Sequence, residues 1–218
     1  MDGVIVDSMP YHFIAWYEAL KPLGIRVNCF DVYSREGERW EETLKDLLAG
    51  AKITPSQEIL KRVFKQRQKI FKRYFKQFIF KDVGASLACL HNKGYLLGLV
   101  TGTPLKEVRH ILPQKIFQQF DCIVTGDTVE RGKPHPEPYL KASNMLGVKP
   151  SECVVIENAP LGIDSAKKAG MFCIGFTTSL PKEYLKDADV TADTLEAIIG
   201  LIDRTCIKQK QSKKTNRQ

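Results

Sequence analysis

Two short apolar runs of this chain end in polar residues that suit the binding of an anion or a metal ion. The run at 96–100 is followed by Thr101-Gly102-Thr103-Pro104, and the run at 153–156 is followed by Glu157 and Asn158. Each pattern predicts a buried strand, a turn and then a helix. Ligands of open parallel sheets collect outside the carboxyl ends of the strands, so these polar side chains are expected to converge.

Lys133 lies between the two runs, in the rigid loop Gly132-Lys133-Pro134-His135-Pro136. The Thr101 hydroxyl and the backbone N–H groups of Gly102 and Thr103 suit phosphate oxygens, because a helix N-terminus favours anions. The Lys133 ammonium suits the charge that develops on a phosphoryl group during its transfer. We therefore expect Thr101, Gly102, Thr103 and Lys133 to bind phosphate.

With the opening segment Asp2-Gly3-Val4-Ile5-Val6-Asp7-Ser8, the chain resembles the haloacid dehalogenase-like hydrolases, in the helical-cap branch that includes beta-phosphoglucomutase and sugar phosphatases. The resemblance is carried by Met-Asp-Gly-Val-Ile-Val-Asp-Ser at 1–8, Val-Thr-Gly-Thr at 100–103, Gly-Lys-Pro at 132–134 and Val-Val-Ile-Glu-Asn-Ala-Pro-Leu-Gly-Ile at 154–163. Each motif alone is weak evidence, and the ordered set is strong. The resemblance implies an α/β fold with a Rossmann-like parallel sheet core and an inserted all-helical cap domain.

The resemblance also implies a carboxylate nucleophile that takes the phosphoryl group as an aspartyl-phosphate, which water or a second substrate then removes. In the family pattern this residue stands two positions before the acid-base Asp, which Asp2 matches, so it is expected directly before Met1. We expect Met1 to be the internal residue of an Asp-Met-Asp-Gly signature. The alternative is a natural loss of the nucleophile and of a central strand. That loss would leave buried backbone groups unpaired, at about 1–3 kcal/mol each.

Asp2, Thr101 and Lys133 are the expected catalytic residues, with Asp2 as the general acid for the leaving oxygen and later as the base for a water. The expected cofactor is Mg²⁺, which prefers oxygen ligands, held by Glu157, Asn158 and, from the resemblance, the Asp2 carbonyl. Asn158 departs from the commoner acidic residue at its position. Its amide oxygen can coordinate, but the lost charge should weaken the site.

The expected domains are an α/β core at 1–8 and 83–203 with an incomplete first strand, a helical cap at 9–82, and a basic disordered tail at 204–218. Thr54-Pro55-Ser56-Gln57 predicts a capping box at the start of a long amphipathic helix. Its expected apolar face includes Leu60, Val63, Phe71, Tyr74 and Phe78. Residues 61–81 also contain nine Lys or Arg and no acid, which is typical of a solvated basic face.

Cap residues choose the substrate in this architecture, because the cap closes over the phosphate site. The candidates are His12, Arg35 and Arg39. His12 resembles a position used for acid-base control in the mutase, and a packed structural His is an equal alternative. Arg35 or Arg39 could hold a second phosphate with both guanidinium nitrogens.

The composition of the 218 residues fits one core domain with a cap, and no apolar stretch is long enough to span a bilayer. The net charge of +8 is concentrated in the tail, which carries six basic residues and no acid from position 204. The six cysteines show no paired spacing, so we expect reduced thiols and a cytoplasmic protein. Nucleic-acid binding is not expected, because no recognised module accompanies the basic residues.

The expected function is that of a Mg²⁺-dependent phosphatase acting on a small phosphorylated metabolite of the sugar phosphate class, provided that the nucleophilic Asp precedes Met1. A beta-phosphoglucomutase-like isomerase is the first alternative, since it uses the same site. A non-catalytic protein that keeps the phosphate pocket is the second. The sequence leaves the oligomeric state open.

Overall fold

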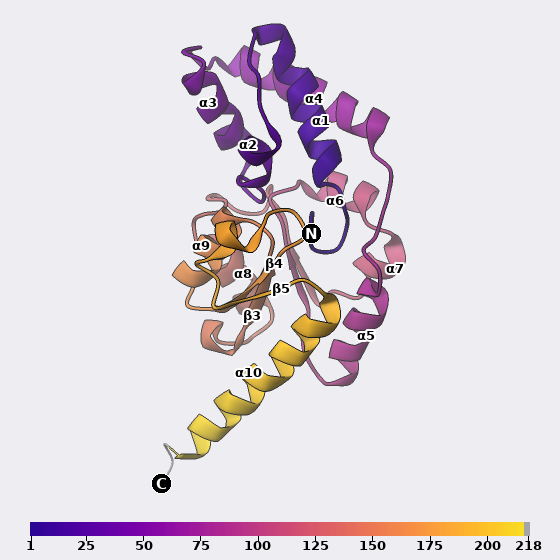
Figure 1. Ribbon diagram of the computed structural model, residues 1–218, viewed down its shortest axis with the longest axis vertical. Coiled ribbons are helices and arrows are strands. Elements are labelled where there is room, and N and C mark those ends of the chain that lie inside the picture. The colour runs from indigo at the N-terminus through magenta and orange to yellow at the C-terminus, as the bar shows by residue number, and fades with distance from the viewer. Residues whose placement is uncertain (216–218) are drawn as a thin grey trace.

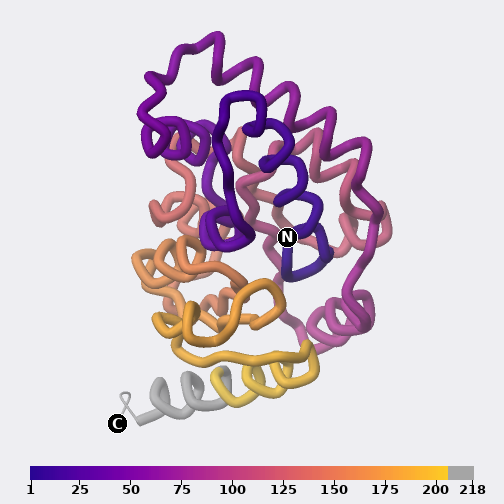
Figure 2. The backbone as a smooth tube through the Cα atoms, turned by 45° about the horizontal axis from the view of Figure 1, so that its top comes forward, coloured from indigo at the N-terminus to yellow at the C-terminus, as the bar shows by residue number. Residues whose placement is uncertain are grey.

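The computed structural model describes residues 1–215, with residues 206–215 described only as helical backbone. Figures 1 and 2 show a group of helices set against one end of a larger α/β body, with Met1 at the junction of the two. The fold is the expected parallel α/β core with a helical cap. The described residues contain no helix that is long and apolar enough to cross a membrane.

The cap is built from helices alone. Its elements are α1 (Met9–Leu20), η1 (Lys21–Leu23), α2 (Cys29–Tyr33), α3 (Trp40–Gly50) and α4 (Gln57–Tyr74). Leu20, Leu44 and Leu48 are completely buried between these helices. Each such side chain contributes about 1.5–3 kcal/mol by leaving water, so the cap has a hydrophobic core of its own.

The core alternates helices and parallel strands. Its elements are α5 (Val83–Asn92), β1 (Gly98–Val100), α6 (Leu105–Ile111), α7 (Gln114–Phe117), β2 (Cys122–Val124), α8 (Glu137–Met145), η2 (Pro150–Glu152), β3 (Val154–Glu157), α9 (Pro160–Lys168), β4 (Phe172–Phe176), η3 (Lys182–Leu185), β5 (Val190–Ala192) and α10 (Leu195–Thr215). The segment expected to be a disordered tail begins inside α10, which continues as helix to Thr215. Residues 216–218 lie outside the described part of the chain.

The strands form two parallel sheets, one of β1 and β2 and one ordered β3-β4-β5. Gly98 is opposite Cys122 in the first sheet, and Val154 is opposite Phe172 in the second. β1 and β3 each pair on one side only among the described strands, and both line an apolar cavity of about 410 Å³. The opening segment enters neither sheet. Its Asp2 and Val6 form one isolated β-bridge, and Val6 forms a second with Ile79.

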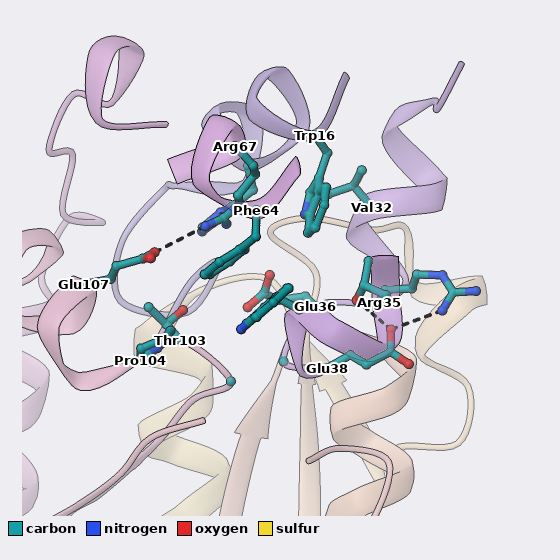
Figure 3. Close-up of a pocket in the computed structure, with 15 residues that line it drawn as sticks. Trp16, Val32, Arg35, Glu36, Glu38, Phe64, Arg67, Thr103, Pro104 and Glu107 are labelled. Carbon is teal, nitrogen blue, oxygen red and sulfur yellow. Dashed lines mark hydrogen bonds and ion pairs between the residues drawn. The ribbon is translucent and has the colours of Figure 1, made fainter. Parts of the chain in front are cut away.

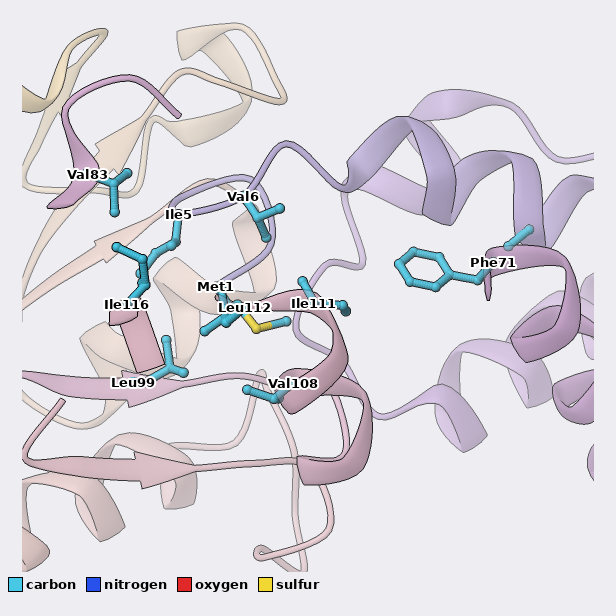
Figure 4. Close-up of a cluster of buried hydrophobic side chains, with 11 residues drawn as sticks. Met1, Ile5, Val6, Phe71, Val83, Leu99, Val108, Ile111, Leu112 and Ile116 are labelled. Carbon is cyan, nitrogen blue, oxygen red and sulfur yellow. The ribbon is translucent and has the colours of Figure 1, made fainter. Parts of the chain in front are cut away.

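One hydrophobic cluster joins the cap to the core (Figure 4). Phe71 of α4 and Val6 of the opening segment belong to it together with Leu99 of β1 and Val108 and Ile111 of α6. Val6, Val108 and Ile111 have no exposed surface. The packing of these side chains fixes the opening segment against β1 and α6, and so positions Asp2.

Helix α4 begins and ends inside the range that its sequence pattern predicted. Ser56 is the N-cap, with its Oγ accepting a hydrogen bond from the Ile59 N–H at 3.2 Å, so the predicted capping box at Thr54 is wrong by two residues. The helix ends at Tyr74, which leaves Tyr74 and Phe78 exposed rather than on the apolar face. The buried face instead includes a cation, Arg67.

Candidate active site

The structure brings the predicted core residues together at the carboxyl ends of β1 and β3. Thr101 directly follows β1, Glu157 is the last residue of β3, and Asn158 comes next. These three residues, Asp2 and Lys133 are each 5% exposed or less. Polar groups buried to this extent require partners, and the partners define the site.

Asp2 joins the cap to the turn after β1. Its Oδ1 accepts a hydrogen bond from Ser8 Oγ at 2.5 Å and lies 3.0 Å from His12 Nε2. Its Oδ2 accepts a hydrogen bond from Thr103 Oγ1 at 3.2 Å. Hydrogen bonds to the charged form of a carboxyl group stabilise that form.

The pKa of Asp2 lies well below its ordinary value. Burial acts to raise it, but the hydrogen bond and charge of His12 and the hydrogen bond from Ser8 outweigh burial. In this state Asp2 is a carboxylate. A role as general acid therefore requires that substrate binding first replaces some of these contacts and returns a proton to the group.

Lys133 and Glu157 form a buried ion pair, in which Lys133 Nζ donates to Glu157 Oε1. The Tyr139 hydroxyl donates to the same oxygen, and Lys133 Nζ lies 5.1 Å from the centre of the Tyr139 ring. Burial acts to raise the pKa of Glu157, but the charge and hydrogen bond of Lys133 and the Tyr139 hydrogen bond lower it below its ordinary value. Burial and the neighbouring Glu157 raise the pKa of Tyr139, which stays a neutral donor.

Two glycines make room for the groups at the end of β3. A Cβ atom at Gly162 would lie 2.1 Å from the carboxyl carbon of Glu157. A Cβ atom at Gly3, whose φ is +67°, would lie 2.1 Å from Asn158 Nδ2. Asn158 Nδ2 donates to Ser179 Oγ at 2.9 Å, which orients the amide. These positions tolerate only glycine while Glu157 and Asn158 keep their places.

The turn at Thr101, Gly102 and Thr103 lies beneath the cap. The Thr103 N–H donates to Thr101 Oγ1 at 3.2 Å, and a Cβ atom at Gly102 would lie 2.6 Å from the carbonyl oxygen of Gly37 in the cap. Helix α6 begins at Leu105 with Pro104 as its N-cap, one residue later than predicted. The turn predicted to bind phosphate therefore precedes the helix instead of forming its first turn.

Of the three cap candidates, only His12 contacts the core site. Its Nδ1 lies 2.5 Å from Arg67 Nη2, on the opposite side of the ring from Asp2. Arg35 lines the cavity under the cap but is bound to Glu38 and Asp46. Arg39 lies outside that cavity, where its Nη1 donates to the Glu130 carbonyl at 2.6 Å. Their roles in substrate binding remain predictions.

Sequence reasoning missed Arg67, Glu36 and Tyr139. Arg67 looked like one more residue of a basic helix face, although its spacing from Val63 and Phe71 places it on the buried stripe. Glu36 lies between the two arginines that were considered, and only the closure of the cap brings it to Asp2. Tyr139 follows the Lys133 loop by six positions, and the sequence carries no signal for its contact with Glu157.

Comparison with known proteins decides the family. A family model described as haloacid dehalogenase-like hydrolase matches residues 1–170. The chain belongs to the haloacid dehalogenase-like hydrolases. Beta-phosphoglucomutase of Bacillus subtilis is 32% identical over 189 residues, which are 83% of this chain and 82% of the relative.

Two further comparisons agree with this placement among the haloacid dehalogenase-like hydrolases. A phosphorylated carbohydrates phosphatase of Thermotoga maritima is 33% identical over 174 residues, covering 78% of this chain and 79% of the relative. The solved structure of a protein described as a putative beta-phosphoglucomutase from Bacteroides vulgatus matches with a TM-score of 0.80 at 30% identity. That match covers 89% of this chain and 82% of the other. The relatives thus include both a phosphatase and a mutase.

The donor set of this haloacid dehalogenase-like hydrolase fits a magnesium ion in the type of its atoms. Asp2, Glu157 and Asn158 offer carboxylate, carbonyl and amide oxygens, which are the ligands that Mg²⁺ prefers. The described residues contain no group of three or more His, Cys, Asp or Glu side chains placed to hold a metal ion. Mg²⁺ is commonly held by one or two carboxylates together with substrate phosphate. The chain offers the Glu157 carboxylate for this purpose, beside the Asp2 carbonyl and the Asn158 amide oxygen.

Proposed function

We propose that the protein is a Mg²⁺-dependent phosphatase that hydrolyses a small phosphorylated metabolite of the sugar phosphate class. The observation that carries the proposal is the buried Lys133–Glu157 pair, in the same site as Asp2 and Thr101. A fixed cation, a hydroxyl-bearing turn and oxygen ligands for a metal ion are the groups that phosphoryl transfer requires. The names of the phosphatase and mutase relatives support the substrate class.

The proposed nucleophile is an Asp directly before Met1, which forms an aspartyl-phosphate that water hydrolyses. Its support is the place of the Met1 backbone nitrogen. This nitrogen is buried, and Asp2, Lys133 and Glu157 lie near enough for their charges to act on it. A residue bonded to this nitrogen would therefore lie among the groups proposed to bind phosphate.

The residues of this chain have separate tasks in the proposed reaction. Lys133, Thr101 and the 102–103 backbone bind the phosphate oxygens, and Lys133 exchanges part of its contact with Glu157 for the substrate. Asp2 gives a proton to the leaving oxygen and later takes one from the attacking water. Mg²⁺, held by Asp2, Glu157 and Asn158, supplies positive charge to the transferring phosphoryl group when it is bound.

The test is phosphate release from a panel of sugar phosphates by the polypeptide that includes the residues encoded before Met1, with and without Mg²⁺. We expect Mg²⁺-dependent release, and we expect Lys133→Met to abolish it. Mass spectrometry of the endogenous N-terminus checks the nucleophile, since a protein that begins at Met1 contradicts that part of the proposal. Binding of Mg²⁺ and a phosphosugar without turnover of any ester would favour the non-catalytic alternative.

A beta-phosphoglucomutase-like isomerase is the second candidate, and the 32% identity to the Bacillus subtilis mutase favours it. The two activities differ in whether water or a sugar hydroxyl takes the phosphoryl group. Assay of beta-glucose-1-phosphate isomerisation beside phosphate release separates them.

We propose a cytoplasmic location. Its support is the state of the five cysteines within the described residues, which are all free: Cys29, Cys89, Cys122, Cys153 and Cys173. Burial raises the pKa of Cys173 well above its ordinary value, so this thiol is unreactive.

A further inference from the structure

The cavity between the cap and the turn after β1 combines aromatic walls with charged groups (Figure 3). Trp16, Trp40 and Phe64 form the aromatic part, and the Trp40 and Phe64 rings are stacked with their centres 3.8 Å apart. Gly102 and Thr103 line the opposite side, so the cavity borders the proposed phosphate site. Whatever remains of the substrate after its phosphate is bound lies here.

Two arginines line the cavity, and the charge of the first, Arg35, is already neutralised. Arg35 Nη1 lies 2.8 Å from Asp46 Oδ2 and 3.1 Å from Glu38 Oε2. Glu38 Oε2 also accepts a hydrogen bond from Thr43 Oγ1 at 2.7 Å. The group therefore has two carboxylate partners within the cap, and an incoming anion would have to compete with both.

The second guanidinium, that of Arg67, is engaged through both of its terminal nitrogens, while its buried Nε has no hydrogen-bond partner among the described residues. Arg67 Nη1 lies 3.2 Å from Glu107 Oε2 (Figure 3). Its Nη2 lies 2.5 Å from His12 Nδ1. Its guanidinium carbon lies within 6.0 Å of the ring centres of Trp16, Phe64 and Phe71. Gln68 donates to the other oxygen of Glu107 at 2.6 Å. Arg67 connects the cap to the core, and an anion that took either terminal nitrogen would have to displace Glu107 or His12.

Glu36 is the charged group that remains. Its carboxylate is directed into the cavity, toward Phe64 and Thr103 (Figure 3). No hydrogen bond or ion pair joins the Glu36 carboxylate to another of the described residues. Among the lining residues, the carboxylates of Glu36, Glu38 and Glu107 thus face only two guanidinium groups.

We propose that this cavity accepts a neutral, hydroxyl-bearing leaving group and rejects one that carries a second phosphate or a carboxylate. The proposal rests on the proposed phosphatase function and specifies its substrate as a monophosphate ester of a sugar or polyol. Glu36 accepts hydrogen bonds from hydroxyl groups, and the aromatic rings contact the apolar faces of the carbon skeleton. A like charge placed beside Glu36 is disfavoured.

The size of the cavity agrees with such a group. The space open to the centre of a water molecule is about 60 Å³. A single water needs about 10–15 Å³ on this measure, so the cavity holds about four to six waters. At about 30 Å³ of liquid volume for each water, their combined volume is about 120–180 Å³, which matches a triose to a hexose.

The proposal also favours hydrolysis over isomerisation. A mutase that moves a phosphoryl group between two hydroxyls of one sugar forms a doubly phosphorylated sugar, because the aspartyl-phosphate transfers its group to a sugar that already carries one. The second phosphate of that species would lie in the cap cavity, beside Glu36 and without a free cation among the residues that line it.

The test compares two matched substrate pairs at pH 8 with the complete polypeptide and Mg²⁺. The pairs are glucose 6-phosphate with glucose 1,6-bisphosphate, and glycerol phosphate with phosphoglycolate. We expect kcat/KM to be higher for the neutral leaving group in each pair, by a factor on the order of 10 to 100. Glu36→Gln should reduce this preference about tenfold. Glu42→Gln is the control, since it removes an exposed cap carboxylate paired with Lys45 and should leave the preference unchanged.

Equal or better use of the bisphosphate by the unmodified protein would overturn the proposal, and so would an unchanged preference in Glu36→Gln. Failure of the phosphatase function looks different, since no ester of either pair would then be hydrolysed. In that case thermal-shift titration with the same four compounds replaces turnover. Stronger binding of the doubly charged member of each pair would contradict the proposed selection.

Discussion

Replacement of Glu36 should change the pH dependence of stability in a direction that the structure fixes. Burial is the larger cause and the charge of Asp2 the next, and together they raise the pKa of Glu36 from 4.5 to about 7. His12, the Met1 amino group and Lys133 act in the opposite direction without cancelling this rise. The folded protein therefore keeps a proton on Glu36 at pH values where the unfolded chain has lost it.

The sign and size of the stability change follow from the linkage between folding and the protonation of Glu36. Between pH 4.5 and about 7 the folded state binds more protons than the unfolded state, so the free energy of unfolding decreases as the pH rises through this window. One pKa unit corresponds to about 1.36 kcal/mol, so the raised pKa of Glu36 destabilises the folded protein at pH 8 by at most about 3 kcal/mol. Solvent near a partly exposed group reduces this destabilisation. We therefore expect the change in the free energy of unfolding caused by Glu36→Gln to be more favourable at pH 8 than at pH 5, by about 1–3 kcal/mol.

Urea unfolding at pH 5 and pH 8, with EDTA present to remove divalent ions, measures this difference. Glu42→Gln serves as the matched control, since its exposed carboxylate should shift stability by less than about 0.5 kcal/mol at both pH values. If Glu36→Gln changes the free energy of unfolding equally at pH 5 and pH 8, the electrostatic account of this residue is refuted.

Substitutions at three further positions test the site and its supports. Lys133→Met should destabilise the protein by about 3–5 kcal/mol in urea unfolding, because it leaves Glu157 buried without its cation, and Lys133→Arg should lose less. Gly162→Ala should reduce Mg²⁺-dependent phosphate release at least tenfold, because the new methyl group occupies the place of the Glu157 carboxyl group. Unchanged activity and Mg²⁺ dependence would contradict the close approach of Gly162 to Glu157. Arg67→Met should lower the free energy of unfolding by about 2–4 kcal/mol, because it leaves Glu107 without its cation. A change below about 0.5 kcal/mol in urea unfolding would show that the cap does not depend on the Arg67–Glu107 pair.

The sequence predicted that the core residues of the candidate site would lie together. Thr101, Glu157 and Asn158 were predicted because each follows an apolar run, and a parallel sheet gathers the residues after its strands at one edge. Lys133 had no such local signal, and its place in the order of motifs identified it. The structure puts it in contact with Glu157.

The cap contacts were not predictable from the sequence. Which of Arg35, Glu36 and Arg39 faces the cavity depends on how the α2–α3 loop lies on the turn after β1, where Gly102 and the Gly37 carbonyl are in close approach. Arg67 shows a second limit, since helical periodicity places a residue on a buried stripe but does not indicate that a cation can be buried there. Arg67 can be buried because it contacts Glu107 and His12, which come from distant parts of the chain.

β1 and β3 each leave one edge without a strand partner among the described residues, and both strands line the cavity of about 410 Å³ that Met1 also lines. A strand encoded before Met1, as proposed above, would enter the molecule at this place and could give both edges a backbone partner. In the complete polypeptide we therefore expect amide hydrogens of β1 and β3 to exchange about as slowly as those of β4, which is paired on both sides. Much faster exchange in β1 and β3 would contradict a strand at this position.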